Sequence, residues 1–153
     1  MAKKGISSSR EPWTRKSSAG PEKAPRAQRA PDGATSTHRR GAQGEERAAE
    51  YLVDLHYTIL ERNFRTRTGE VDIIAVEGGT IAFCEVKSWE RMPIAGLEYA
   101  LSRRKQGRII RTSLWYLHTH PCLSRLQPRY DVLFVSSEGV EHLMNAFSER
   151  GAW

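Results

Sequence analysis

The first candidates for chemistry are four charged side chains in two otherwise apolar segments joined by Gly78-Gly79. A Gly-Gly pair between apolar segments is typical of a two-residue β-hairpin turn. Such a turn places Asp72 opposite Glu85, and the same register places Glu70 opposite Lys87. Opposed residues share a face, with Cβ atoms about 4.5–5.5 Å apart. Residues two apart on a strand share that face as well, so the sequence predicts one cluster of three carboxylates and one ammonium.

The same register assigns the apolar residues of the hairpin to two faces. The face that carries the charged cluster continues with Ile74, Val76, Ile81 and Phe83. The opposite face is predicted to be wholly apolar, with Val71, Ile73, Ala75, Ala82, Cys84 and Val86.

The cluster has the residue types of a phosphodiester-hydrolysing site. Two adjacent carboxylates repel each other unless a cation lies between them, and Mg²⁺ binds one or two carboxylates together with phosphate oxygens. Asp72 and Glu85 therefore predict a Mg²⁺ (or Mn²⁺) site that polarises a phosphate and activates water. Lys87 would orient that water or offset charge in the transition state. The alternative for Glu70 and Lys87 is a plain cross-strand ion pair of about 0.2–1 kcal/mol.

The positive charge of the chain is concentrated near its N-terminus. Residues 1–40 carry a net charge of +7 and residues 41–153 a net charge of −1. Residues 1–38 are rich in Pro, Ser, Ala and Gly, so we expect a disordered basic leader followed by one domain at 39–153. The leader would bind nucleic-acid phosphates. The alternatives are a solvating segment with no specific role and a misplaced start codon.

The expected setting is the cytoplasm. No segment approaches the length of a transmembrane helix, so no membrane partner is expected. The N-terminal segment lacks the apolar run of a secretory signal. Cys84 and Cys122 are too few for a disulfide framework, which is typical of a reducing compartment.

The elements that must position the cluster follow the order α-β-β-β-α-β-β, which predicts a mixed sheet flanked by helices. The first helix is predicted at 43–55, because its apolar residues recur with helical spacing. Ser102 is the predicted N-cap of the second helix, which runs to about residue 117. The remaining elements are strands at 57–64, 130–135 and 140–144, a loop at 89–96, and a loop between Pro121 and Pro128.

The two predicted helices carry further candidates. Glu45, in the first turn of the first helix, would add a third carboxylate to the metal, or would only complement the helix dipole. The second helix is basic and either contacts nucleic-acid backbone or is a solvated face. Its candidate nucleic-acid contacts are Arg104, Lys105, Arg108 and Arg111. Lys105-Gln106, near the helix start, would reach the active site, where Gln106 would hold water or phosphate as an accessory.

The histidines carry no predicted site. His118 and His120 close the second helix without further ligands at metal spacing, so we interpret them as surface residues. His142 is isolated in the sequence.

Several motifs, in their order along residues 39–147, resemble the YraN-like family of small bacterial proteins, which is classed with endonuclease-like folds of the PD-(D/E)XK type. The motifs are Gly41-x-x-Gly44-Glu45, Leu60-Glu61-Arg62-Asn63-Phe64, Gly69-Glu70-Val71-Asp72-Ile73-Ile74, Phe83-Cys84-Glu85-Val86-Lys87 and Lys105-Gln106. The resemblance implies a restriction-endonuclease-like α/β fold. The chain departs from the family pattern at Cys84, where an apolar residue such as Val is common.

The resemblance also implies roles for the candidate residues. In the wider nuclease superfamily an Asp on one strand and a Glu-x-Lys on the next bind a divalent metal and cleave phosphodiesters, which corresponds to Asp72, Glu85 and Lys87. Glu45 matches the helix Glu that archaeal Holliday-junction resolvases add. Glu70 matches the Glu of the family's Gly-Glu-x-Asp motif.

The sequence therefore predicts a metal-dependent nuclease that hydrolyses nucleic acid, and DNA is the expected substrate. The alternative is a non-catalytic nucleic-acid-binding or DNA-repair accessory protein on a nuclease scaffold. The intact acid-acid-lysine set favours the enzyme, because a pure binder gains nothing from carboxylates that face phosphate. The preferred nucleic-acid structure, the number of metals and the oligomeric state, including a homodimer, stay open.

Overall fold

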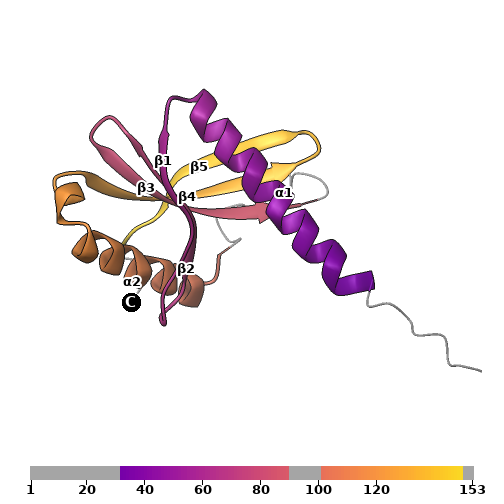
Figure 1. Cartoon of the computed structure of the whole chain (residues 1–153), viewed down its shortest axis with the longest axis horizontal. Helices are drawn as coiled ribbons and strands as arrows, with labels where there is room; N and C mark the ends of the chain where they lie inside the picture. Colours follow the sequence, from indigo (N-terminus) through magenta and orange to yellow (C-terminus); the bar gives the residue numbers. More distant parts are fainter. Residues whose placement is uncertain (1–31, 90–100, 150–153) are drawn as a thin grey trace, which may run out of the picture. The chain divides into compact units, whose positions relative to one another are not determined.

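The structure is a computed structural model of the 153-residue chain, and it describes residues 32–89 and 101–149. A five-stranded mixed sheet and two α-helices make up the described part (Figure 1). The predicted order of helices and strands is confirmed. The elements are α1 Asp32–Asp54, β1 Thr58–Arg65, β2 Glu70–Glu77, β3 Thr80–Ser88, α2 Arg103–Thr119, the short 3-10 helix η2 Pro121–Leu123, β4 Gln127–Ser136 and β5 Gly139–Phe147.

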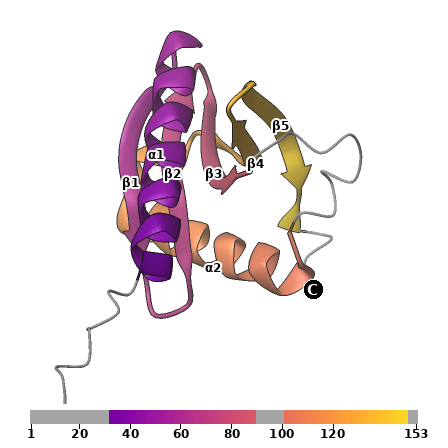
Figure 2. The same ribbon diagram turned by 90° about the vertical axis from the view of Figure 1, so that its right-hand side faces the viewer.

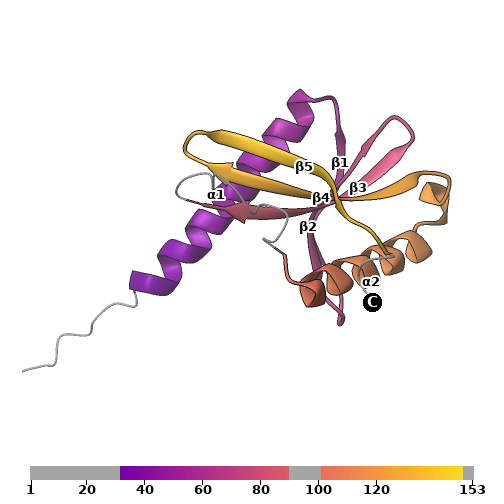
Figure 3. The ribbon, with the colours of Figure 1, turned by 180° about the vertical axis from the view of Figure 1, so that it is seen from behind.

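The strands lie in the order β1-β2-β3-β4-β5, and β3 and β4 are the one parallel pair among the described strands. A parallel pair needs a crossover connection, and α2 lies in the segment between β3 and β4. The other neighbours are antiparallel, as the β4–β5 hairpin shows in Figure 3.

The buried residues form one cluster on each side of the sheet. The cluster beneath α2 includes Ile74, Phe83 and Ile110, and the cluster beneath α1 includes Leu52 and Ala82. In Figure 2, α1 runs vertically along the sheet and α2 runs horizontally below it. The two helices therefore pack on different clusters of the sheet.

Val71 corrects the predicted assignment of faces. It packs with Ile74 in the cluster beneath α2, whereas Ile73 packs beneath α1. Strict alternation would have put Val71 and Ile73 on the same face. The alternation is interrupted at Asp72, whose side chain reaches β3 to accept a hydrogen bond from the Val86 backbone N–H.

Two predicted boundaries also differ from the structure. The first helix begins at Asp32, so residues 32–38 are helical although we assigned them to the disordered leader. Pro128 lies in β4, near its start, where a proline interrupts few ladder hydrogen bonds. The rest of the predicted leader and most of the predicted loop at 89–96 lie outside the described residues. Neither described helix is long and apolar enough to cross a membrane.

Candidate active site

The β2–β3 hairpin has the predicted register over its central part. The paired residues run from Glu77–Thr80 at the turn to Ile73–Cys84. Gly78 has a φ of 55°, a left-handed conformation that glycine adopts without steric cost. The regular pairing between β2 and β3 stops at Ile73–Cys84, just before the charged residues.

Asp72 takes over the connection between the strands where the regular pairing ends. Its Oδ2 accepts a hydrogen bond of 2.8 Å from the backbone N–H of Val86. At this point β2 is therefore connected to β3 by the hydrogen bond of the Asp72 carboxylate and not by backbone pairing. The predicted proximity of Asp72 to Glu85 is retained, since the charge of Glu85 raises the pKa of Asp72.

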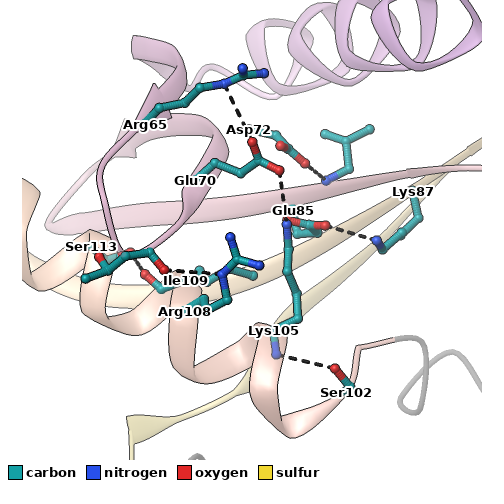
Figure 4. Close-up of polar contacts among 12 residues, drawn as sticks. Arg65, Glu70, Asp72, Glu85, Lys87, Ser102, Lys105, Arg108, Ile109 and Ser113 are labelled. Carbon is teal, nitrogen blue, oxygen red and sulfur yellow. Dashed lines mark hydrogen bonds and ion pairs between the residues drawn. The ribbon is translucent and has the colours of Figure 1, made fainter. Parts of the chain in front are cut away.

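Glu85 lies at the centre of the cluster and is almost fully buried, with 3% of its surface exposed. Its Oε1 lies 3.0 Å from Lys87 Nζ, and its Oε2 lies 2.9 Å from Lys105 Nζ (Figure 4). A buried carboxylate is costly unless it is paired. The two ammonium groups therefore make the burial of Glu85 tolerable.

Lys105 comes from the first turn of α2, which begins where sequence reasoning placed it. Ser102 is the N-cap, and its Oγ accepts a hydrogen bond of 3.3 Å from the backbone N–H of Lys105. The Lys105 ammonium also lies 3.6 Å from Glu70 Oε1. Burial lowers the pKa of Lys105, but its hydrogen bond with Glu85 and the nearby carboxylates outweigh burial, so the pKa is raised. Lys105 therefore stays an ammonium within the cluster.

Glu70 does not face Lys87 in the structure, contrary to the predicted extension of the register. It lies 3.6 Å from Arg65 Nε and 3.6 Å from Lys105 Nζ, and Lys87 pairs with Glu85 instead. The reason is that the regular β2–β3 pairing ends before Glu70, so the register no longer determines which side chains meet.

Glu45 approaches the cluster from α1. Gly44 allows this, because its position touches Ser88 at the end of β3 and leaves no room for a side chain. Glu45 is near enough to raise the pKa of Asp72 by its charge. Its Oε2 accepts a hydrogen bond of 2.8 Å from Asn63 Nδ2 on β1, which holds the carboxylate at the side of the cluster.

Gln106 and the arginines of α2 lie around the cluster. Gln106 Nε2 donates to the Leu101 carbonyl at 3.0 Å, so this side chain secures the start of the helix. Arg108 Nε donates to the Thr68 carbonyl at 3.2 Å, which joins α2 to the β1–β2 turn. Arg104 and Arg111 are exposed, as a nucleic-acid contact requires.

The pKa of Asp72 is raised to about 7, mainly by burial and then by the charge of Glu85. The hydrogen bond from Val86 and the charge of Lys105 act in the opposite direction and only partly offset these effects. Near neutral pH the site therefore exchanges a proton at Asp72 when no other cation is present.

This raised pKa makes a prediction about stability. A carboxyl group with a raised pKa binds its proton more tightly in the folded state, so it favours folding most below its unfolded pKa of 3.8. With EDTA present, the wild type should lose unfolding free energy relative to Asp72→Asn as the pH rises towards about 7. Urea unfolding of both proteins across this range measures the difference, and a difference that is constant with pH would contradict the assignment.

A second charged network, which sequence reasoning missed, lies on β4 and β5. Asp131 is fully buried and is bound by Arg129, with Nε–Oδ1 at 2.9 Å, and by His142, with Nε2–Oδ2 at 2.9 Å. Arg129 also donates to the Tyr57 hydroxyl at 2.6 Å. His142 is therefore part of a structural network and is not isolated. The alternation of Arg129 and Asp131 on one strand is the signal that could have indicated it.

Asp131 is held as a carboxylate by its partners. Burial raises the pKa of Asp131. The hydrogen bonds from His142, Arg129 and the Asn145 backbone lower it by more than burial raises it, so the pKa lies below its ordinary value. These contacts connect β4, β5 and Tyr57, which indicates a role in stability.

The donor set of the cluster bears on the predicted metal. Within 32–89 and 101–149, no three His, Cys, Asp or Glu side chains converge as a metal-binding group, so Glu45 as a third metal ligand stays a prediction. Asp72 and Glu85 remain as two hard oxygen donors, and Glu85 Oε2 has a cation 2.9 Å away in the form of Lys105 Nζ. This set fits Mg²⁺, which commonly takes one or two carboxylates and completes its shell with water and phosphate.

Comparison with known proteins connects these residues with a family. The model of the uncharacterised protein family UPF0102 matches residues 44–135. A UPF0102 protein of Syntrophus aciditrophicus is 46% identical over 118 residues, which cover 74% of this chain and 91% of that protein. A UPF0102 protein of Treponema denticola is 37% identical over 123 residues, which cover 71% of this chain and 95% of that protein. The matched range contains the whole charged cluster.

Proposed function

We propose that this chain, which belongs to the UPF0102 family, is a metal-dependent nuclease that hydrolyses phosphodiester bonds in nucleic acid, with DNA as the expected substrate. The observation that carries the proposal is the meeting of Asp72, Glu85 and two lysines at the end of one hairpin. The mixed sheet with helices on both faces is compatible with the restriction-endonuclease-like fold that the motifs imply.

The residues of the chain have separate roles in this proposal. Asp72 and Glu85 would hold Mg²⁺, which when bound would polarise the phosphate and make water more acidic. Lys87 is about one-third exposed, so its ammonium can reach a phosphate oxygen or orient the attacking water. Lys105 neutralises Glu85 from α2 and would keep the buried carboxylate in place before a metal binds.

One observation favours the alternative of a non-catalytic nucleic-acid-binding or repair accessory protein. Lys105 lies 2.9 Å from Glu85 and already neutralises one of the two carboxylates that a metal would need. A cluster neutralised by its own lysines would stabilise the fold and leave nucleic-acid binding to the exposed arginines of α2. Cleavage separates the two functions, because the accessory protein would bind its substrate without cutting it.

The test is a cleavage assay of the full chain on end-labelled single-stranded, duplex and four-way-junction DNA, with matched RNA strands. Each substrate is incubated with Mg²⁺, Mn²⁺ or EDTA. The expected result is cleavage of at least one substrate that requires the metal and stops with EDTA. Binding in a gel-shift assay with intact substrate under all metal conditions would reject the nuclease and favour the accessory protein.

A further inference from the structure

A cavity of about 710 Å³ lies between the β1–β2 turn and α2. Three arginines line it: Arg65 from the end of β1, Arg67 from the turn and Arg111 from the helix. Phe64 forms part of the wall and packs edge-on against Tyr116. Trp115 also lines the cavity, and 55% of its surface is exposed. The described lining therefore combines positive charge with an open aromatic face.

The walls of this cavity are fixed by hydrogen bonds between the turn and the helix. The Thr66 backbone N–H donates to the Gly69 carbonyl at 2.8 Å, which closes the turn. The hydroxyls of Thr66 and Thr68 lie 3.3 and 3.5 Å from the hydroxyl of the fully buried Thr112. A Cβ atom on Gly69 would lie 3.1 Å from the Cβ of Arg108, so the turn packs tightly against the helix. A ligand would therefore enter a preformed cavity and lose little affinity to ordering it.

The lining chemistry selects one kind of ligand. Guanidinium groups bind phosphates with paired hydrogen bonds, and every nucleobase has a π-face that stacks on an aromatic ring. Bases inside a duplex are already stacked on their neighbours, so only an unpaired base is free to cover Trp115. No acidic residue is among the described residues that line the cavity. Arg65 also lies 3.6 Å from Glu70, which joins the cavity to the charged cluster.

We propose that this cavity binds an unpaired nucleotide, with its base stacked on Trp115 and the adjacent phosphates on Arg67 and Arg111. The proposal rests on the proposed function for what the rest of the strand does. Lys105 in the cluster and Trp115 in the cavity are ten residues apart on α2. Ten residues of α-helix span about 15 Å along the helix axis. A stacked strand rises about 3.4 Å per nucleotide along its axis, so the bound nucleotide lies within roughly four nucleotides of the cluster. The preferred substrate is therefore a strand with an unpaired segment beside the scissile phosphate.

The test measures binding without cleavage. Fluorescence anisotropy of a labelled 12-nucleotide oligothymidylate is recorded with the full chain at low salt in EDTA. Trp115→Ala should weaken binding about 5- to 150-fold, as expected for the loss of one base stack, and Trp115→Phe should retain most of the affinity. Leu114→Ala is the matched control, because Leu114 is an exposed apolar neighbour that does not line the cavity. It should bind as the wild type does.

Two further arms identify the ligand. A blunt 12-base-pair duplex should bind Trp115→Ala and the wild type within about twofold of each other, because its bases are paired. For Arg67→Ala, the dependence of log K on log salt for the single strand should fall by about 0.7, the value of one phosphate contact. A parallel series uses oligouridylate in place of oligothymidylate. Tighter binding of oligouridylate assigns the pocket to RNA, and tighter binding of oligothymidylate assigns it to DNA.

The proposal is overturned if Trp115→Ala binds the single strand as the wild type does, or loses single-strand and duplex binding equally. These outcomes are separate from the fate of the nuclease. Trp115-dependent binding without metal-dependent cleavage would retain the cavity and reject the nuclease. Metal-dependent cleavage, together with single-strand binding that Trp115→Ala does not change, would retain the nuclease and reject the cavity.

Discussion

Asp72→Asn is expected to reduce the rate of metal-dependent cleavage by about 100-fold or more, because a metal ligand contributes several kcal/mol of transition-state stabilisation. Asn keeps an oxygen that can accept the hydrogen bond from the Val86 backbone N–H, so the connection between β2 and β3 is preserved. The change removes the negative charge and little else. The measurement is the single-turnover cleavage rate of the best substrate at saturating Mg²⁺.

The matched control is Glu77→Gln, which removes an acid from the exposed turn end of the same strand. It should cleave at the wild-type rate. Lys87→Ala should also be slow, since it removes the partly exposed ammonium beside Glu85. Thermal unfolding of each variant separates lost chemistry from lost structure. Cleavage at the wild-type rate in both Asp72→Asn and Lys87→Ala would show that the active site lies elsewhere.

Asp131→Ala is expected to lower the free energy of unfolding by about 3–5 kcal/mol, the usual cost of removing one partner from a buried ion pair. The change leaves Arg129 and the nearly buried His142 without their common carboxylate. It also removes the acceptor for the Asn145 backbone N–H. Urea unfolding followed by circular dichroism measures the loss.

The control for this prediction is Glu138→Ala, an exposed acid at the turn of the same hairpin. It should change the free energy of unfolding by less than about 0.5 kcal/mol, as surface substitutions usually do. Asp131→Asn should fall between the two, because it keeps one oxygen acceptor and loses the charge that pairs with Arg129. A loss below about 1 kcal/mol in Asp131→Ala would mean that the network does not stabilise the fold.

The central hairpin could be predicted because its interactions are local. A two-residue turn and alternating apolar residues determine which residues pair, and the structure has this register from Glu77–Thr80 to Ile73–Cys84. The N-cap at Ser102 was equally readable, since its hydroxyl bonds to a backbone N–H three residues away. Both features depend on neighbours in the chain.

The contacts that the sequence did not predict join residues that lie far apart in the chain. The sequence placed Glu70 beside Lys87, but the regular pairing ends before them, and Glu70 meets Lys105 from α2 instead. The sequence predicted that the start of the second helix reaches the site, but the hairpin residues alone do not determine which carboxylates Lys105 contacts. The Asp131 network was missed for the same reason, since its members come together only when β4, β5 and Tyr57 pack.

By itself, the sequence determined the order of the elements, the central register of the hairpin and the presence of Asp72, Glu85 and Lys87 at its end. Only the tertiary structure decided that Lys105 neutralises Glu85 and that Trp115 and three arginines line one cavity. The physical reason is the range of the interactions. Turn geometry and strand alternation act over a few residues, whereas the position of α2 depends on packing against the whole face of the sheet.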